Sequence, residues 1–89
     1  MKKKRLSVGI IGDGGWGTTL AKVLAEKECA VTVWGPFPDY IRELSRRRVN
    51  RKFLPGGKLP KSINFTADLK KVVSENNYLV LAIPSQFLI

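Results

Sequence analysis

The chain has 89 residues, 44% of them apolar, with 16 basic and 7 acidic side chains and a formal net charge of +9. This length allows one small domain or part of one. The longest apolar run, residues 78–84, is strand-sized, whereas a membrane span needs about 18 apolar residues. The basic residues 1–5 are not followed by the apolar core of a signal peptide. We therefore expect a soluble cytoplasmic protein with no membrane partner.

Cysteine and histidine content limits the chemistry of this segment. The single cysteine, Cys29, cannot form an internal disulfide, which is typical of a reducing compartment. The absence of histidine excludes a Ser-His or Cys-His catalytic pair and a histidine metal site here. The positive charge favours anionic partners such as nucleotides, phosphorylated metabolites or nucleic acid, although a solvated surface also explains each basic cluster.

The first predicted strand leads into a glycine-rich turn. Residues 6–11 (LSVGII) predict a buried strand of a parallel sheet, and a helical pattern begins at Thr18. Between them Gly12, Gly14 and Gly17 have G-x-G-x-x-G spacing, which in this context is typical of a dinucleotide-binding unit. Gly12 allows the sharp exit from the strand, Gly14 lets the backbone approach a diphosphate, and Gly17 lets the helix pack closely. The alternative is a purely structural turn.

The following residues complete one βαβ unit. Small and apolar residues recur at helical spacing at Gly17, Leu20, Ala21 and Leu24. Residues 30–34 (AVTVW) predict the second strand, and the crossover between the two strands is expected to be right-handed.

The end of the second strand is where such folds read the adenosine ribose. NAD sites usually carry Asp or Glu there, about 20 residues beyond the glycines, and NADP sites carry Arg. Residues 35–38 (GPFP) hold neither, which leaves the choice between NAD and NADP open. Phe37 either lies against the adenine or fills a turn. Asp39 is predicted to be the N-cap of the next helix.

The middle of the chain predicts a helix, a loop, a strand and another helix. Residues 40–48 form the first helix and end in three arginines, which are either a solvated end or ligands of a 2′-phosphate. Residues 49–62, with two prolines and two glycines, predict a long loop. Residues 63–65 predict a short third strand, and residues 66–75 a helix that begins with a capping residue.

A fourth buried strand is predicted at residues 78–83 and is followed by Pro84 and Ser85. In an open α/β sheet, ligands lie beyond the carboxyl ends of the strands. Ser85 and Gln86 therefore either contact a cofactor or make an ordinary turn, and Pro84 and Ser85 are assigned to the predicted cofactor site. Together the elements predict an α/β fold of the Rossmann type, a doubly wound parallel sheet of about four strands in the order βαβαβαβ.

Four motifs, in this order, carry a family resemblance: IGDGGWGT at residues 11–18, VTVWG at 31–35, NRKFLPG at 50–56 and IPSQ at 83–86. The chain resembles the N-terminal part of NAD(P)-dependent glycerol-3-phosphate dehydrogenases. The resemblance implies an NAD or NADP cofactor and reversible reduction of dihydroxyacetone phosphate to sn-glycerol 3-phosphate, which feeds glycerophospholipid synthesis. It also implies that residues 1–89 are part of a dinucleotide-binding domain, that the catalytic lysines and substrate pocket lie C-terminal to it, and that the full-length protein can be a homodimer.

The resemblance also assigns roles within the turn. Gly15 and Trp16 correspond to family positions that contact the cofactor, and Pro36 stands where the family often has a basic residue near the ribose. Asp13 replaces the usual alanine and is expected to weaken diphosphate binding unless it points to solvent. We expect this segment alone to bind cofactor weakly or not at all and to catalyse nothing. The alternatives are another NAD(P)-dependent Rossmann dehydrogenase or a non-catalytic nucleotide-sensing or nucleic-acid-binding module.

Overall fold

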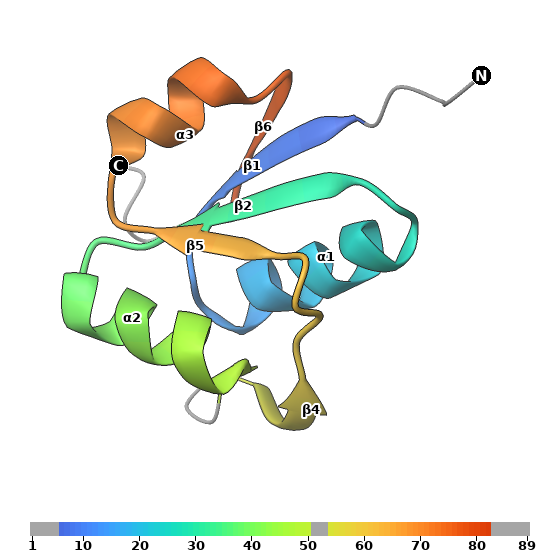
Figure 1. Cartoon of the computed structure of the whole chain (residues 1–89), viewed down its shortest axis with the longest axis vertical. Coiled ribbons are helices and arrows are strands. Elements are labelled where there is room, and N and C mark those ends of the chain that lie inside the picture. Colours follow the sequence, from blue (N-terminus) through green and yellow to red (C-terminus); the bar gives the residue numbers. More distant parts are fainter. Residues whose placement is uncertain (1–5, 51–53, 83–89) are drawn as a thin grey trace.

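The computed structural model describes residues 6–50 and 54–82, with side chains for residues 6–48 and 58–82. Strands and helices alternate along most of this length, as the sequence predicts (Figure 1). The elements are β1 (Ser7–Ile11), α1 (Gly15–Glu26), β2 (Ala30–Trp34), α2 (Pro38–Arg47), β3 (Val49–Asn50), β4 (Leu54–Lys58), β5 (Asn64–Thr66), α3 (Leu69–Glu75) and β6 (Tyr78–Leu81).

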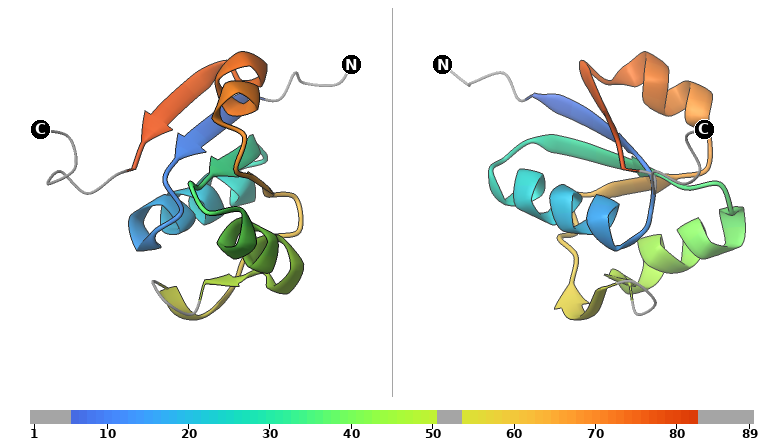
Figure 2. Two further views of the ribbon diagram at one scale, coloured as in Figure 1. Left: turned by 90° about the vertical axis from the view of Figure 1, so that its left-hand side faces the viewer. Right: turned by 180° about the vertical axis from the view of Figure 1, so that it is seen from behind.

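Four parallel strands form the main sheet in the order β5-β2-β1-β6. Ile11 pairs with both Trp34 and Leu81, so β1, β2 and β6 end at the same edge of the sheet. Helices α1 and α2 lie on one face and α3 lies on the other (Figures 1 and 2). This strand order and the covering of both faces are those of the first part of a doubly wound Rossmann sheet, which confirms the predicted fold class.

The core lies between the central strands and α1. Ile10 of β1 and Val33 of β2 have no exposed surface, and Val31 is 1% exposed. Ala21 faces them from α1 and is also fully buried, as its place in the predicted apolar stripe requires. Burial of each such aliphatic side chain stabilises the fold by about 1.5–3 kcal/mol, less for Ala21, so these two strands hold the edge of the sheet that carries the glycine turn.

The fourth strand is in the predicted place, but the prediction that it is buried is wrong. Tyr78 is 57% exposed, Leu79 46% and Leu81 64%. The reason is that β6 is the outermost strand of the sheet and pairs only with β1. A continuous apolar run such as that of β6 is typical of a strand that is covered on both faces. The described residues leave β6 partly uncovered.

The prediction of a loop over residues 49–62 is partly wrong, because β3 and β4 pair there as a short antiparallel ribbon with an irregular register. Proline and glycine are unfavourable in β-strands, so the sequence pattern does not predict β3 and β4. The same segment also contributes to the core, since Leu59 is 3% exposed. The third strand is displaced by one residue from the prediction, and Ile63 just before it is fully buried.

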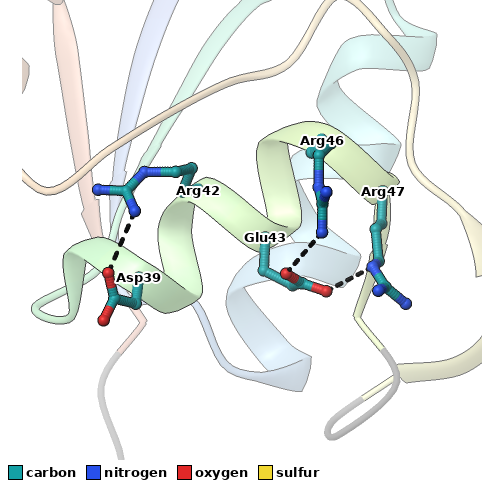
Figure 3. A network of polar contacts seen from close by, with 5 residues as sticks. All are labelled: Asp39, Arg42, Glu43, Arg46 and Arg47. Atoms are coloured by element: carbon teal, nitrogen blue, oxygen red, sulfur yellow. Dashed lines mark hydrogen bonds and ion pairs between the residues drawn. The ribbon is translucent and has the colours of Figure 1, made fainter.

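The predicted starts of two helices are also corrected. Helix α1 begins at Gly15, three residues before Thr18. Helix α2 begins at Pro38, so Asp39 lies in its first turn and Phe37 is the N-cap, without a side-chain capping bond. The carboxylate of Asp39 instead pairs with Arg42 at 3.2 Å (Figure 3). Proline is favourable at the first helical position because it has no N–H group that needs an acceptor. The helix therefore begins at Pro38, one residue before the predicted N-cap, Asp39.

Helix α3 has a true side-chain cap, but not at its predicted start. Asp68 is the N-cap, and its carboxylate accepts a hydrogen bond of 3.2 Å from the backbone N–H of Lys71. The hydroxyl of Thr66 accepts from the N–H of Asp68 at 3.1 Å and so supports the turn that precedes the helix. The helix therefore covers only Leu69–Glu75 of the predicted range.

Candidate functional site

The glycine turn leaves the sheet between the ends of β2 and β6. The N–H of Gly12 donates to the carbonyl oxygen of Trp34 at 2.9 Å, and the N–H of Ala82 donates to that of Ile11 at 2.9 Å. Gly12 has φ +136°, a conformation that L-residues with side chains rarely adopt, and an added Cβ would overlap the carbonyl oxygen of Ala82. The predicted sharp exit from the strand is thus confirmed.

Helix α1 starts directly against this turn. A Cβ at Gly17 would overlap the carbonyl oxygen of Gly12 and lie 3.4 Å from Cβ of Ala82. Thr18 is fully buried, and both its backbone N–H and its hydroxyl donate to the carbonyl oxygen of Gly14 at 2.9 Å. Close packing at Gly17 is therefore confirmed, and the two bonds of Thr18 fix where the helix begins.

Gly14 differs from the other two glycines because nothing in the fold requires it. It is the N-cap of α1, with φ −76° and ψ −171° and no side-chain capping bond, and an added Cβ would meet no atom within 4 Å. The first N–H groups of an α-helix have no acceptor within the helix, and the helix dipole makes this end electropositive. The amides of Gly15, Trp16 and Gly17 belong to this first turn. Open space beside Gly14 and the electropositive start of α1 fit a bound diphosphate.

Two aromatic side chains lie at the starts of the first two helices. Trp16 on α1 and Phe37 before α2 are each 67% exposed, and Pro36 is exposed beside Phe37. All three side chains are therefore accessible from solvent. The remaining predicted site residues, Pro84 and Ser85, lie outside the described residues.

Asp13 reaches from the glycine turn across the end of β2. A Cβ added at Gly35, the residue that follows β2, would overlap the carboxylate oxygen Oδ2 of Asp13, and it would lie 2.8 Å from Cδ1 of Ile41 on α2. Oδ2 is buried, whereas Asp13 as a whole is partly exposed. The sequence features related to this contact are an acid in the glycine turn and a glycine at the end of the second strand. These residue types alone do not predict that the two residues meet.

The charge of Asp13 extends to helix α2. Partial burial raises the pKa of the Tyr40 phenol above its ordinary value of 10.0, and the negative charge of Asp13 raises it further. Both effects favour the neutral phenol. The N-terminal half of α2 is therefore close enough to the glycine turn to sense this carboxylate.

The arginines at the end of α2 have partners of their own. Glu43 pairs with Arg46 at 3.2 Å and with Arg47 on its other oxygen (Figure 3). The guanidinium of Arg48 donates to the carbonyl oxygens of Pro60, at 3.3 Å, and Ile63. These residues lie at the C-terminal end of α2, whereas Asp13 affects its N-terminal half, so the geometry favours the solvated-end interpretation for Arg46 and Arg47 and a structural role for Arg48.

The described residues contain neither a membrane-spanning helix nor a metal-binding cluster of side chains. None of the helices in residues 6–50 and 54–82 is long and apolar enough to cross a membrane. Within the same ranges no group of three or more His, Cys, Asp or Glu side chains is placed to hold a metal ion.

Comparisons with known proteins point to one family. Residues 7–89 match the family model described as NAD-dependent glycerol-3-phosphate dehydrogenase N-terminus. The chain is 44% identical over 79 residues to glycerol-3-phosphate dehydrogenase [NAD(P)+] of Geobacter metallireducens, a match that covers 89% of the chain and 24% of the relative. It is 45% identical over 80 residues to the protein of the same name from Agathobacter rectalis, covering 90% of the chain and 24% of the relative.

Solved structures agree with this result. The crystal structure of glycerol-3-phosphate dehydrogenase from Coxiella burnetii superposes with a TM-score of 0.82 at 32% identity, covering 91% of the chain and 25% of that structure. The chain thus spans about a quarter of the length of the proteins it matches.

Proposed function

Because the chain belongs to the family of NAD-dependent glycerol-3-phosphate dehydrogenases, whose N-terminus it matches over residues 7–89, we propose that its glycine turn binds the diphosphate of NAD or NADP. The observation that carries this proposal is Gly14, since its missing side chain leaves a space that no atom of the described residues fills. A diphosphate in that space would accept hydrogen bonds from the amides of the first turn of α1.

The proposed contacts follow the geometry of the turn. The backbone of the turn would hold the diphosphate, Trp16 would flank it, and Phe37 with Pro36 would border the adenosine. Pro84 and Ser85 follow β6, whose end lies at the same edge of the sheet as the turn. The proposed cofactor-binding residues are Gly12, Gly14, Gly15, Trp16, Gly17, Pro36, Phe37, Pro84 and Ser85.

We further propose that the longer protein interconverts dihydroxyacetone phosphate and sn-glycerol 3-phosphate for glycerophospholipid synthesis. A bound nicotinamide would supply or accept the hydride. The reaction also needs a proton donor and a phosphate-binding pocket, and we assign these to sequence beyond residue 89 because the relatives are about four times as long. Residues 1–89 would then be the N-terminal part of the dinucleotide-binding domain.

The setting of the protein is part of the same proposal. A cytoplasmic location is supported by the lone Cys29, which is typical of a reducing compartment. The partners would be the cofactor, the small phosphorylated substrate and a second copy of the full-length protein, and neither nucleic acid nor a membrane is expected to bind. Sedimentation of the full-length protein tests the dimer.

The proposal is tested by adding a side chain at Gly14 without disturbing the fold. Serine is a good N-cap residue, and its Cβ would meet open space, so Gly14→Ser is expected to keep the free energy of unfolding within about 0.5 kcal/mol. The same Cβ would collide with a diphosphate. Calorimetric titration with NADH is therefore expected to show binding weakened by at least about tenfold, or about 1.4 kcal/mol.

The titration uses the chain itself and a chimera in which it replaces the matched segment of the Geobacter metallireducens protein. Thr19→Ser, on an exposed position of α1, is the matched control and is expected to bind like the parent. A Gly14→Ser chimera that binds NADH as the parent does would refute the placement of the diphosphate. In a steady-state assay with dihydroxyacetone phosphate and NADH, turnover by the 89-residue chain alone would contradict the assignment of catalysis to later sequence.

A further inference from the structure

We propose that Asp13 selects against a 2′-phosphate on the adenosine ribose, so that the site prefers NAD to NADP. This inference rests on the proposed cofactor binding and adds to it the choice of nucleotide. It assigns a specificity role to a residue that the sequence pattern alone treats as unfavourable for binding.

The position of the carboxylate carries the argument. In dinucleotide-binding folds the acid that accepts a hydrogen bond from the ribose 2′-hydroxyl usually stands at the end of the second strand. Here that position is held by Gly35, which has no side chain. The carboxylate of Asp13 lies against Gly35 so closely that a Cβ there would overlap it. An acid is thus present at the end of β2, but it comes from the turn after β1.

The charge of this carboxylate acts at short range and is poorly screened. Its Oδ2 atom is buried, and partly buried charges interact more strongly than solvated ones. Cδ1 of Ile41 on α2 lies against the same Gly35 as this carboxylate, so the carboxylate is close to the start of α2 and raises the pKa of Tyr40 there. A ribose 2′-hydroxyl is neutral and can donate to a carboxylate, whereas a 2′-phosphate brings close to two negative charges. The carboxylate therefore favours the hydroxyl.

Three arginines of α2 are paired with other acids. Arg42 pairs with Asp39, and the two side chains are 75% and 96% exposed, so their charges are largely screened by solvent. Arg46 and Arg47 pair with Glu43, further along the helix (Figure 3). A partly buried acid at the strand end and solvated bases on the helix together predict discrimination against the phosphate.

The test compares ligands that differ only at the 2′ position, on the chain and on the chimera described above. Calorimetry measures the dissociation constants of NADH and NADPH, and of the fragments AMP and adenosine 2′,5′-bisphosphate, which report on the ribose site without any catalysis. The parent is expected to bind each 2′-hydroxyl ligand at least about tenfold more tightly than its 2′-phosphate counterpart. Asp13→Asn removes the charge with little change of shape and is expected to reduce this ratio by about tenfold.

Asp39→Asn is the matched control, because it makes the same change in net charge at an acid that is 96% exposed. It is expected to change the ratio by less than about threefold. An equal shift in both variants would overturn the proposal, since the net charge and not the position of Asp13 would then be responsible. An unchanged ratio in Asp13→Asn would overturn it as well.

Two further results keep the proposal falsifiable. A parent protein that binds NADPH as tightly as NADH refutes it without any variant. If Asp13→Asn does not fold, Asp13→Ala is expected to give the same loss of discrimination. Failure of the underlying proposal looks different, because the chimera would then bind none of the four ligands, whereas failure of the specificity role leaves NADH binding intact and sensitive to Gly14→Ser.

Discussion

At the scale of single residues, the environment of Tyr40 predicts how the free energy of unfolding changes at alkaline pH. The pKa of Tyr40 is raised above 10.0 by burial and, to a smaller extent, by Asp13, so the folded state favours the neutral phenol. This contribution to stability is complete below pH 10.0 and is lost as the pH rises through the folded-state pKa. We expect the unfolding free energy, measured in urea, to fall more steeply between pH 10.0 and the folded-state pKa in the parent than in Tyr40→Phe.

Asp13→Asn provides the control for the electrostatic part. It is expected to lower the pKa of Tyr40, measured by the ultraviolet absorbance of tyrosinate against Tyr40→Phe, without returning it to the ordinary value, because burial is the larger cause. A Tyr40 that ionises at or below pH 10.0 in the parent would contradict the placement of these two residues.

At the scale of elements, Arg48 joins the end of α2 to the start of β5. Its backbone is left-handed, with φ 59°, and its guanidinium donates to two carbonyl oxygens of the segment before β5 and lies 5.3 Å from the ring centre of Phe65. Hydrogen bonds to charged groups contribute about 1.5–3 kcal/mol each. We expect Arg48→Ala to lower the free energy of unfolding by about 2–3 kcal/mol, measured by urea denaturation.

Two variants separate the side chain from the backbone. Arg48→Gly also removes the guanidinium but relieves the left-handed conformation, so it is expected to be less destabilising than Arg48→Ala by about 1 kcal/mol. Arg47→Ala, which removes a half-exposed ion pair with Glu43, is expected to cost less than about 1 kcal/mol. Equal stability of Arg48→Ala and Arg47→Ala would show that Arg48 does not hold these elements together.

At the scale of the whole molecule, β6 is an edge strand of the sheet formed by the described residues, and Leu81 on it is 64% exposed. Exposed strand edges pair with other chains. The net charge of +9 opposes such pairing because two copies of the chain repel each other. Salt weakens this repulsion, since the Debye length is about 8 Å at physiological ionic strength and shorter at higher salt. We therefore expect the 89-residue chain to self-associate increasingly as salt is raised, in sedimentation equilibrium, and Leu81→Lys to suppress this association.

The matched control adds the same charge away from the edge. Thr19→Lys lies at an exposed position of α1 and is expected to self-associate like the parent. Suppression by both variants would mean that charge, and not the edge strand, governs association. A parent that stays monomeric at raised salt would contradict the prediction directly.

Local sequence was sufficient for the order of the three helices and the four strands of the main sheet, and for the glycine turn. Strand residues 30–34 are predicted with both boundaries correct, because a mainly apolar, β-branched run that stops at Gly35 and Pro36 is a local signal. The spacing of Gly12, Gly14 and Gly17 likewise predicts a turn between strand and helix, and the structure bears out the close contacts at Gly12 and Gly17. The binding of a cofactor to that turn stays a prediction.

The amino-acid sequence by itself therefore determined the βαβ plan, the parallel sheet and the bend at its edge, since these depend on residue types a few positions apart. Only the tertiary structure decided where Asp13 points, which partners Arg48 has, that Leu59 is buried, and that β6 is exposed. Each of these depends on segments that are distant in the chain and meet only when the sheet has formed, as the carboxylate of Asp13 does with Gly35. Local sequence patterns do not predict these long-range contacts, because the contacts depend on the order and register of the strands.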